Sequence, residues 1–135
     1  MGGASAPPFS FGLTSTPEVV KLAKYMFQGS YSQQSWQAMV SSPENREQAT
    51  RKLFEDAGGR LEAYYWAFGP DDFVAIADLP DDESAGSISI AASSTGAVMG
   101  RTTKLITMDE AQSMLRKAGK LASSYHRPGA ARAGV

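Results

Sequence analysis

Apolar and polar residues alternate along several short stretches of this chain, and such alternation is typical of β-strands. Residues 24–32 read KYMFQGSYS. Tyr25 and Phe27 fall on one side of an extended chain and Met26 on the other, which predicts a strand buried on both faces. A helix that starts with Thr16 as N-cap is the competing interpretation. We favour a short helical turn followed by the strand.

Three later stretches complete a set of four strands. Residues 60–68 and 72–79 are rich in aromatic and β-branched side chains, and a Gly-Pro-Asp turn lies between them. This arrangement predicts a β-hairpin, because glycine, proline and aspartate each favour turns. Residues 97–107 alternate again after Gly96 and predict the fourth strand.

Helical spacing and cap signals lie between and after these strands. Residues 41–59 begin with a Ser-Pro-Glu start, carry Phe54 in an apolar stripe, and end in two glycines. A second helix starts after Pro80, where three acidic residues complement the helix dipole and Ile88 belongs to the buried stripe. Thr107 begins a capping box for a last amphipathic helix.

The order of these elements predicts the fold class. A β-α-β-β-α-β order with right-handed crossovers gives an α+β, ferredoxin-like sandwich with a four-stranded antiparallel sheet and an extra C-terminal helix. We divide the chain into an arm (1–20), the domain (21–125) and a flexible tail (126–135). Phe9 and Phe11 in the arm predict an extended segment that packs on a neighbouring subunit or a partner protein.

The second face of the sheet predicts the quaternary structure. If Leu61 and Tyr65 face the helices, then Tyr64, Trp66 and Phe68 line the opposite face. A ferredoxin-like unit covers one sheet face, so this aromatic patch needs a cover. We expect a homo-oligomer, a dimer or a multiple of dimers, with Tyr64 and Trp66 at the interface.

Charge and composition exclude several classes of protein. The 135 residues carry a net charge of -1, so nucleic acid and anionic lipid are not expected partners. The chain has no cysteine, which excludes disulfides, thiolate catalysis and zinc-thiolate sites. We expect no cofactor and no metal. No apolar run approaches the ~18 residues of a membrane span, and we expect a cytoplasmic protein.

Candidate chemistry is sparse. Asp71 and Asp72 are adjacent, and neighbours on a strand point to opposite faces, so we do not expect a paired-carboxylate site. His126 lies in the polar tail. The sequence identifies no catalytic residue. As ligand-binding candidates we take one aspartate, one cation, one amide and two aromatic residues: Gln28, Tyr64, Trp66, Asp72 and Arg101.

Three motifs carry a resemblance to a known family. They are the Ala-Gly-Gly-Arg helix end at 57–60, the hairpin corner with Gly69 and Asp72, and the Pro-Asp-Asp-Glu helix start at 80–83. With their surroundings they resemble the GYD-domain family, small bacterial proteins of largely unassigned function, over about residues 24–115. The resemblance implies membership of the dimeric α+β barrel group, whose members pack ferredoxin-like units sheet to sheet.

Two function classes follow. The first is a small self-associating binding or interaction module that holds a ligand or partner through the sheet face and the arm. The alternative is a cofactor-light enzyme of the dimeric α+β barrel type, a monooxygenase, isomerase or decarboxylase acting on a hydrophobic small molecule. The lack of His and Cys in the predicted core favours the first. A cavity of ~300 Å³ or more with Gln28, Asp72 or Arg101 converging on it would favour a ligand site.

Overall fold

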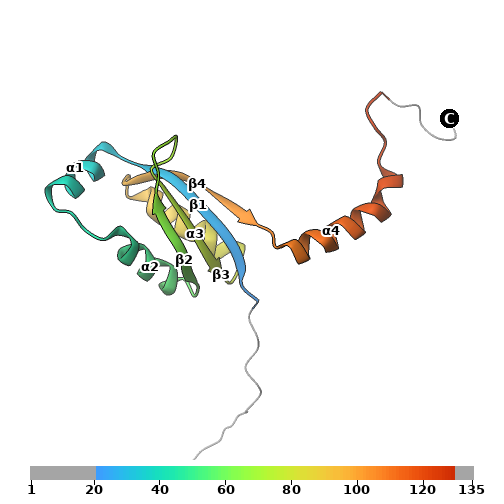
Figure 1. Cartoon of the computed structure of the whole chain (residues 1–135), viewed down its shortest axis with the longest axis horizontal. Coiled ribbons are helices and arrows are strands. Elements are labelled where there is room, and N and C mark those ends of the chain that lie inside the picture. The colour runs from blue at the N-terminus through green and yellow to red at the C-terminus, as the bar shows by residue number, and fades with distance from the viewer. Residues whose placement is uncertain (1–20, 130–135) are drawn as a thin grey trace, which may run out of the picture.

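A computed structural model describes residues 21–129 of the chain. Its four strands form one antiparallel sheet in the spatial order β2-β3-β1-β4, which is the ferredoxin-like order (Figure 1). The predicted α+β fold is therefore confirmed. The arm, with Phe9 and Phe11, lies outside the described residues. The strands are β1 (Ala23–Tyr31), β2 (Arg60–Trp66), β3 (Phe73–Leu79) and β4 (Val98–Leu105).

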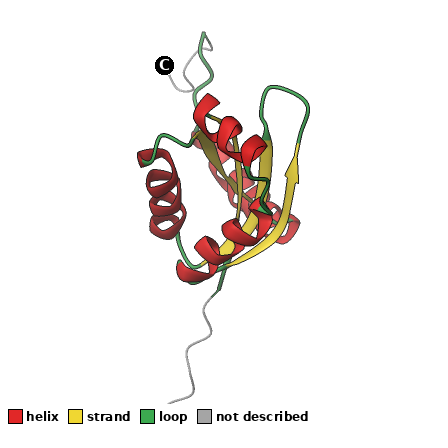
Figure 2. Ribbon diagram, turned by 90° about the vertical axis from the view of Figure 1, so that its left-hand side faces the viewer, coloured by secondary structure: helices red, strands yellow, loops and turns green. Residues whose placement is uncertain are grey.

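Two helices, α2 (Arg46–Asp56) and α3 (Asp82–Ser94), cover one face of the sheet (Figures 1 and 2). Both were predicted. Helix α1 (Gln33–Ser41) was not, although Ser32 caps it by accepting a hydrogen bond from the Ser35 amide. The short polar segment after β1 has no long apolar stripe, so the periodicity gave no signal there.

The helix ends are capped by nearby side chains, but the Ser-Pro-Glu start predicted for α2 was wrong, because Ser41 and Ser42 end α1 and α2 begins only at Arg46. Asn45 and Asp81 accept hydrogen bonds from the first-turn amides of α2 and α3. Thr107 and Glu110 form the predicted capping box at the start of α4 (Met108–Leu121), which a short 3-10 turn (Ala122–Ser124) follows. Asp81, the acidic residue before α3, therefore acts as its N-cap, while Asp82 and Glu83 place negative charge in its first turn.

The core lies between the sheet and these two helices. Phe27 of β1 meets Phe54 of α2 edge to face, with ring centroids 5.0 Å apart. Ala77 and Leu79 of β3 are completely buried. The buried cluster consists of Tyr25, Phe27, Phe54, Leu61, Ala75, Ala77, Leu79, Ala85 and Ile88.

A β-bulge in β2 changes which aromatic side chains face the core. The register with β3 shifts between Leu61 and Ala63, so Glu62 is an extra residue. After the bulge the alternation is inverted. Tyr64 turns toward the helices and packs against the core, whereas Tyr65 is 66% exposed on the other side.

The expectation that Tyr64 and Trp66 line the uncovered face of the sheet is therefore wrong. Trp66 packs against Tyr31 and Trp36, with ring centroids 5.7 and 5.2 Å apart. Phe68 lies in the exposed loop after β2. The alternation that we read from residues 60–68 held only up to the bulge.

We call the uncovered side of the sheet the open face. Its middle row consists of Ala63, Ile76 and Met26, side by side on β2, β3 and β1, and ends at Thr103 on β4. Helix α4 projects away from the sheet and leaves this face uncovered (Figure 1). None of its residues is buried, although its apolar stripe has the predicted spacing.

Candidate functional site

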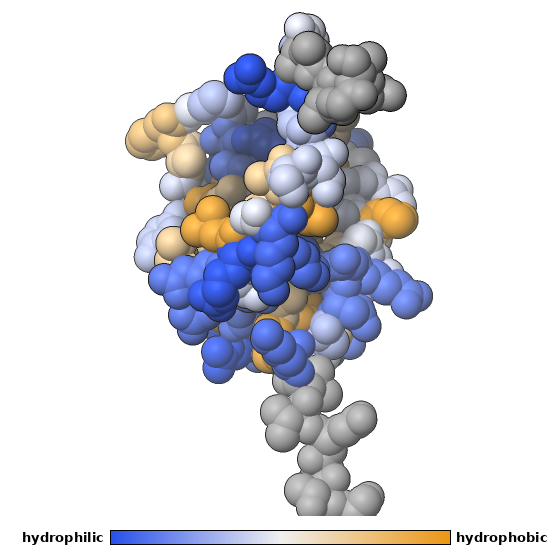
Figure 3. Space-filling view, turned by 90° about the vertical axis from the view of Figure 1, so that its right-hand side faces the viewer, coloured by the Kyte–Doolittle hydropathy of each residue, from blue (hydrophilic) through white to orange (hydrophobic). Residues whose placement is uncertain are grey.

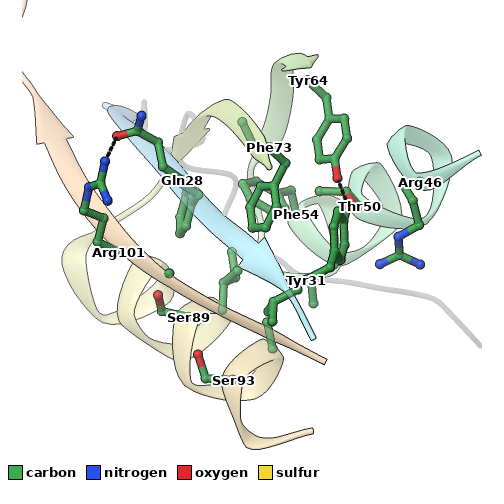
Figure 4. A pocket seen from close by; sticks show the side chains of 17 residues that line it. Gln28, Tyr31, Arg46, Thr50, Phe54, Tyr64, Phe73, Ser89, Ser93 and Arg101 are labelled. Atoms are coloured by element: carbon green, nitrogen blue, oxygen red, sulfur yellow. Dashed lines mark hydrogen bonds between the residues drawn. The ribbon is translucent and has the colours of Figure 1, made fainter. Parts of the chain in front are cut away.

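A cavity of about 110 Å³ lies between the helix-covered face of the sheet and helices α2 and α3 (Figure 4). Its walls are mainly apolar. Polar side chains lie at two places, with Tyr31, Tyr64 and Arg46 on one side and Ser89 and Ser93 on the α3 wall (Figure 4). Among residues 21–129, no Asp, Glu or His lines it. The cavity is thus an apolar space with neutral or cationic hydrogen-bonding groups at more than one place in its wall.

Two glycines allow β1 and β4 to approach each other closely beside this cavity. Gly29 of β1 and Gly100 of β4 are paired across the sheet, and Gly100 borders the cavity. A Cβ on Gly29 would lie 2.4 Å from the Met99 carbonyl oxygen, and one on Gly100 equally close to the Gln28 carbonyl oxygen. The close approach of β1 and β4 here requires glycine on both strands.

Three aromatic residues form a hydrogen-bonded chain beside the cavity. The Tyr31 and Tyr64 hydroxyls bond each other, and the Trp66 indole N–H donates to the Tyr31 oxygen at 3.2 Å. Phe73 stacks on Tyr64 with nearly parallel rings. Burial, together with the hydrogen bond to Tyr31, raises the pKa of Tyr64 above the ordinary value of a phenol. Tyr64 is therefore neutral at physiological pH.

Arg46, the first residue of α2, supplies the positive charge. Its Nη1 donates to Glu44 at 2.8 Å, and the side chain lies beside Tyr31 and Thr50 at the border of the cavity (Figure 4). Within residues 21–129, its Nε atom is buried without a hydrogen-bond partner. A buried donor without a partner is costly, and because this atom has almost no accessible surface, an acceptor from outside the chain has no room beside it.

The predicted ligand-binding residues separate into two groups. Gln28 and Arg101 border the cavity, but their side chains point to the open face, where Arg101 Nη2 donates to Gln28 at 3.3 Å (Figure 4). Arg101 also pairs with Asp71 at 2.7 Å. Tyr64 lines the cavity directly, and Trp66 reaches it through Tyr31.

The hydrogen bonds of Asp72 hold the backbone of the hairpin corner in place. Its carboxylate accepts a hydrogen bond from the Tyr31 amide at 2.9 Å, and its backbone oxygen accepts one from Ala67. These bonds fasten the hairpin corner to the end of β1. Asp71 instead points toward Arg101, so the two adjacent carboxylates do not form a pair, as the strand geometry predicted.

In the part of the chain that the structure describes, neither His126 nor the acidic side chains form a catalytic or metal-binding cluster. His126 is exposed. In the described part of the chain, no group of three or more His, Asp or Glu side chains is placed to hold a metal ion. No helix between residues 21 and 129 has the length and apolar character to span a bilayer.

Sequence reasoning missed the two residues that define the polar end of the cavity. No role was predicted for Arg46, and Tyr31 was expected only in the core or at an interface. A cation at the first position of a helix, where a negative charge is the usual choice, was a signal that could have selected Arg46.

Comparisons with known proteins identify a family. The model of the GYD domain matches residues 25–115, which include β1 from Tyr25 onward, the other three strands, helices α1 to α3 and the start of α4. No curated protein and no solved structure matches the chain.

Proposed function

Because the chain belongs to the GYD-domain family and leaves one face of its sheet uncovered, we propose that it is a self-associating interaction module. Two copies pack through their open faces. The observation that supports this is the row of Ala63, Ile76 and Met26 in the middle of the open face, which no other element of residues 21–129 covers. An antiparallel sheet tolerates water on one face, but a continuous apolar row favours a partner.

The charges on the open face fit a symmetric contact. Asp78 pairs with Lys24 and Arg60 at one end, at 2.8 and 3.2 Å, and Arg101 pairs with Asp71 toward the other. Each cation thus has an anion within its own chain. A second copy meets a face whose charges are already compensated, which reduces repulsion between like charges.

The exposed apolar stripe of α4 adds contact area. Four strands about 4.8 Å apart and about 3.3 Å per residue give the sheet a face of roughly 500 Å². A stable interface buries about 800 Å² per partner, so the sheet face alone falls short. Leu115 and Leu121 of α4 are 69% and 58% exposed, and apolar side chains lie between charged ones on this side of the molecule (Figure 3). In the assembly α4 packs on the second copy.

The size and lining of the cavity favour the hypothesis of an interaction module over that of an enzyme. Its volume is below the ~300 Å³ of a typical substrate site. Gln28, Asp72 and Arg101 do not converge on it. General acid-base chemistry in the cavity would fall to Tyr31 and Tyr64, and the raised pKa of Tyr64 makes it a poor base near neutral pH.

Light scattering of the intact chain tests self-association. We expect a mass of about twice 14.4 kDa at micromolar concentration, and a monomer for Ile76→Lys, because a charge then lies in the middle of the interface. Ile90→Lys is the matched control, since Ile90 is 71% exposed on α3, on the other side of the sheet. A monomeric wild-type chain, or loss of the dimer in both variants, would contradict the proposal.

A further inference from the structure

The cavity between α2 and α3 is open to solvent on the side away from the open face. Leu53 of α2 and Ser93 of α3 border it and are exposed, whereas Phe27 of β1 and Ala75 of β3 line its sheet side and are buried. A small molecule therefore has a way in between the two helices. This way in is independent of self-association, because the second copy of the proposed assembly packs on the other face of the sheet.

Most of the wall suits an apolar group better than water. Phe54 of α2, Ile88 of α3 and Val98 of β4 contribute to it, and the hydroxyl of Ser89 beside them is already bonded to Thr102. A buried water needs about two to four polar partners, and an apolar cavity of ~150 Å³ stays dry. An apolar group that enters this space gains the hydrophobic contribution of its buried surface.

The polar side of the cavity offers one unused proton. Tyr31 and Tyr64 carry two hydroxyl protons between them, and their mutual hydrogen bond uses one. The Trp66 indole N–H donates to Tyr31, and the Arg46 guanidinium is a further hydrogen-bond partner of Tyr31. Indole and guanidinium groups can only donate, so they occupy acceptor sites and leave the second phenolic proton free. Within residues 21–129, no other group accepts that proton.

The electrostatics of the cavity favour a neutral ligand. A cation would meet no carboxylate, because no Asp or Glu among residues 21–129 lines the cavity. An anion would find little of Arg46 available, since Nη1 donates to Glu44 and Nε has almost no accessible surface. A charged group of either sign would lose its hydration here without gaining a matching partner, which is costly.

The volume limits the size of the ligand. The cavity measures about 110 Å³, which is smaller than a cavity of ~150 Å³ that takes benzene with its six carbons. In proportion, it accommodates about four or five non-hydrogen atoms. One of these is the atom that accepts the phenolic proton, and the others form an apolar body.

From these features we propose that the cavity binds a small neutral carbonyl compound, such as a ketone of three or four carbons. Its oxygen accepts the free phenolic proton of Tyr31 or Tyr64, and its alkyl part lies against Ile88 and Val98. A carbonyl fits better than a hydroxyl, because it only accepts, whereas an alcohol adds a proton that needs a further partner. All of these residues come from one chain, so binding does not require the second copy.

Methyl NMR on the full chain, with butanone as the probe, tests this directly. Titration should shift the Ile88 and Val98 methyl resonances saturably, with a Kd of about 1 mM or lower. The methyl groups of Ile90, which is exposed on α3 and does not line the cavity, should not shift. The absence of a saturable shift at Ile88 and Val98 would overturn the proposal.

Two compounds with the same carbon skeleton test which polar group the cavity selects. sec-Butylammonium replaces the carbonyl oxygen by a charged donor, and we expect its affinity to be at least about 10-fold lower than that of butanone. 2-Butanol can accept the phenolic proton but adds its own, and we expect it to bind several-fold more weakly. Equal affinity of butanone and either compound would contradict selection of a neutral carbonyl.

Tyrosine variants locate the hydrogen-bond donor. Tyr31→Phe or Tyr64→Phe alone leaves one phenol with its proton, so each should bind butanone within about 2-fold of the wild type. The double variant has no phenolic proton here, and we expect about 5–10-fold weaker binding. Tyr65→Phe is the matched control, since Tyr65 is exposed and does not line the cavity. Full affinity in the folded double variant would show that the carbonyl oxygen binds elsewhere.

A variant that fills the cavity keeps the test decisive if the double tyrosine variant does not fold. Ala92→Leu should abolish binding, because the longer side chain occupies the space between α3 and the sheet. Ala91→Leu is its control, since Ala91 is exposed and does not line the cavity. Ile76→Lys, on the open face, should bind butanone like the wild type. Full binding by Ala92→Leu, or loss of binding in Ile76→Lys, would place the ligand outside this cavity.

Discussion

The two faces of the sheet are built from different residues for different neighbours. The helix-covered face carries aromatic side chains and small ones. Phe27 packs against Phe54, and Ala77 is completely buried. The open face combines an apolar middle row with ion pairs such as Lys24–Asp78. One face is completed by helices of the same chain, and the other lacks a cover within residues 21–129. In the proposed assembly, the helix-covered face would stabilise the single chain and the open face would form the contact between two copies.

The largest expected difference between the faces is in the cost of removing an aromatic ring. Phe54→Ala should lower the free energy of unfolding by about 3–5 kcal/mol, because the ring is buried and leaves a cavity. Tyr65→Ala on the open face should change it by about 0.5 kcal/mol or less in chains carrying Ile76→Lys. Urea unfolding of both variants in that background measures the contrast, and similar losses at the two positions would contradict it.

The ion pairs of the open face should have a smaller effect. Burial disfavours the ionised form of Asp78, but hydrogen bonds and charge from Lys24 and Arg60 outweigh it and lower the pKa of this carboxyl. A lowered pKa stabilises the fold above the unfolded-state value near 4, and this contribution is lost as the pH falls through the folded-state pKa.

Asp78→Asn should therefore lower the free energy of unfolding by about 1–3 kcal/mol at pH 7. On acidification, this free energy should then decrease less in the variant than in the wild type. Chemical unfolding between pH 7 and the acid range measures both effects. Asp56→Asn is the control, since the Asp56–Lys52 pair is exposed on α2. An equal acid dependence in wild type and Asp78→Asn would argue against a stabilising role for this network.

The helix-covered face should instead be sensitive to alkali. Burial, followed by the hydrogen bond from its hydroxyl to Asp82, raises the pKa of Tyr25 to about 12. The phenol of Tyr25 thus loses its proton near pH 10 in the unfolded chain but only near pH 12 in the folded one. The free energy of unfolding therefore decreases as the pH rises from about 10 to about 12.

Tyr25→Phe removes this titration. We expect it to cost about 1 kcal/mol at pH 7, where the hydrogen bond is lost, and to make the decline above pH 10 shallower, while the part of the decline due to Tyr64 remains. Thermal unfolding across that range, with exposed Tyr125→Phe as the control, measures the change. A decline as steep as in the wild type would exclude Tyr25 as its source.

The smallest effect on the single chain is expected at α4. Leu115→Ser should change monomer stability by about 0.5 kcal/mol or less in the Ile76→Lys background, because Leu115 is exposed. In the wild-type background it should weaken the dimer, since α4 then loses apolar contact with the second copy. Sedimentation equilibrium in both backgrounds, with Lys117→Ser as the control, separates the two outcomes.

Local chemistry explains which parts of the fold were predictable. The positions of β1 and β3, the Asp81 cap and the Thr107–Glu110 capping box depend on residues within a few positions of each other. Period-2 alternation and capping side chains act over that range, so they can be read from the sequence. Helix α1 was not predicted, because a capping serine at position 32 does not indicate a helix unless an apolar pattern of helical period follows it, and that pattern is weak here.

Local periodicity and caps were enough to predict the four strands, helices α2 to α4 and the order of these elements, but not helix α1. The tertiary structure decided which way the aromatic side chains face. The bulge at Glu62 arises from the pairing of β2 with β3, and it moves Tyr64 from the expected interface to the wall of the cavity. The tertiary structure also places Arg46 of α2 beside Tyr31, which lies 15 positions earlier in the chain. Neither local period nor cap encodes such contacts, because they depend on how distant segments pack together.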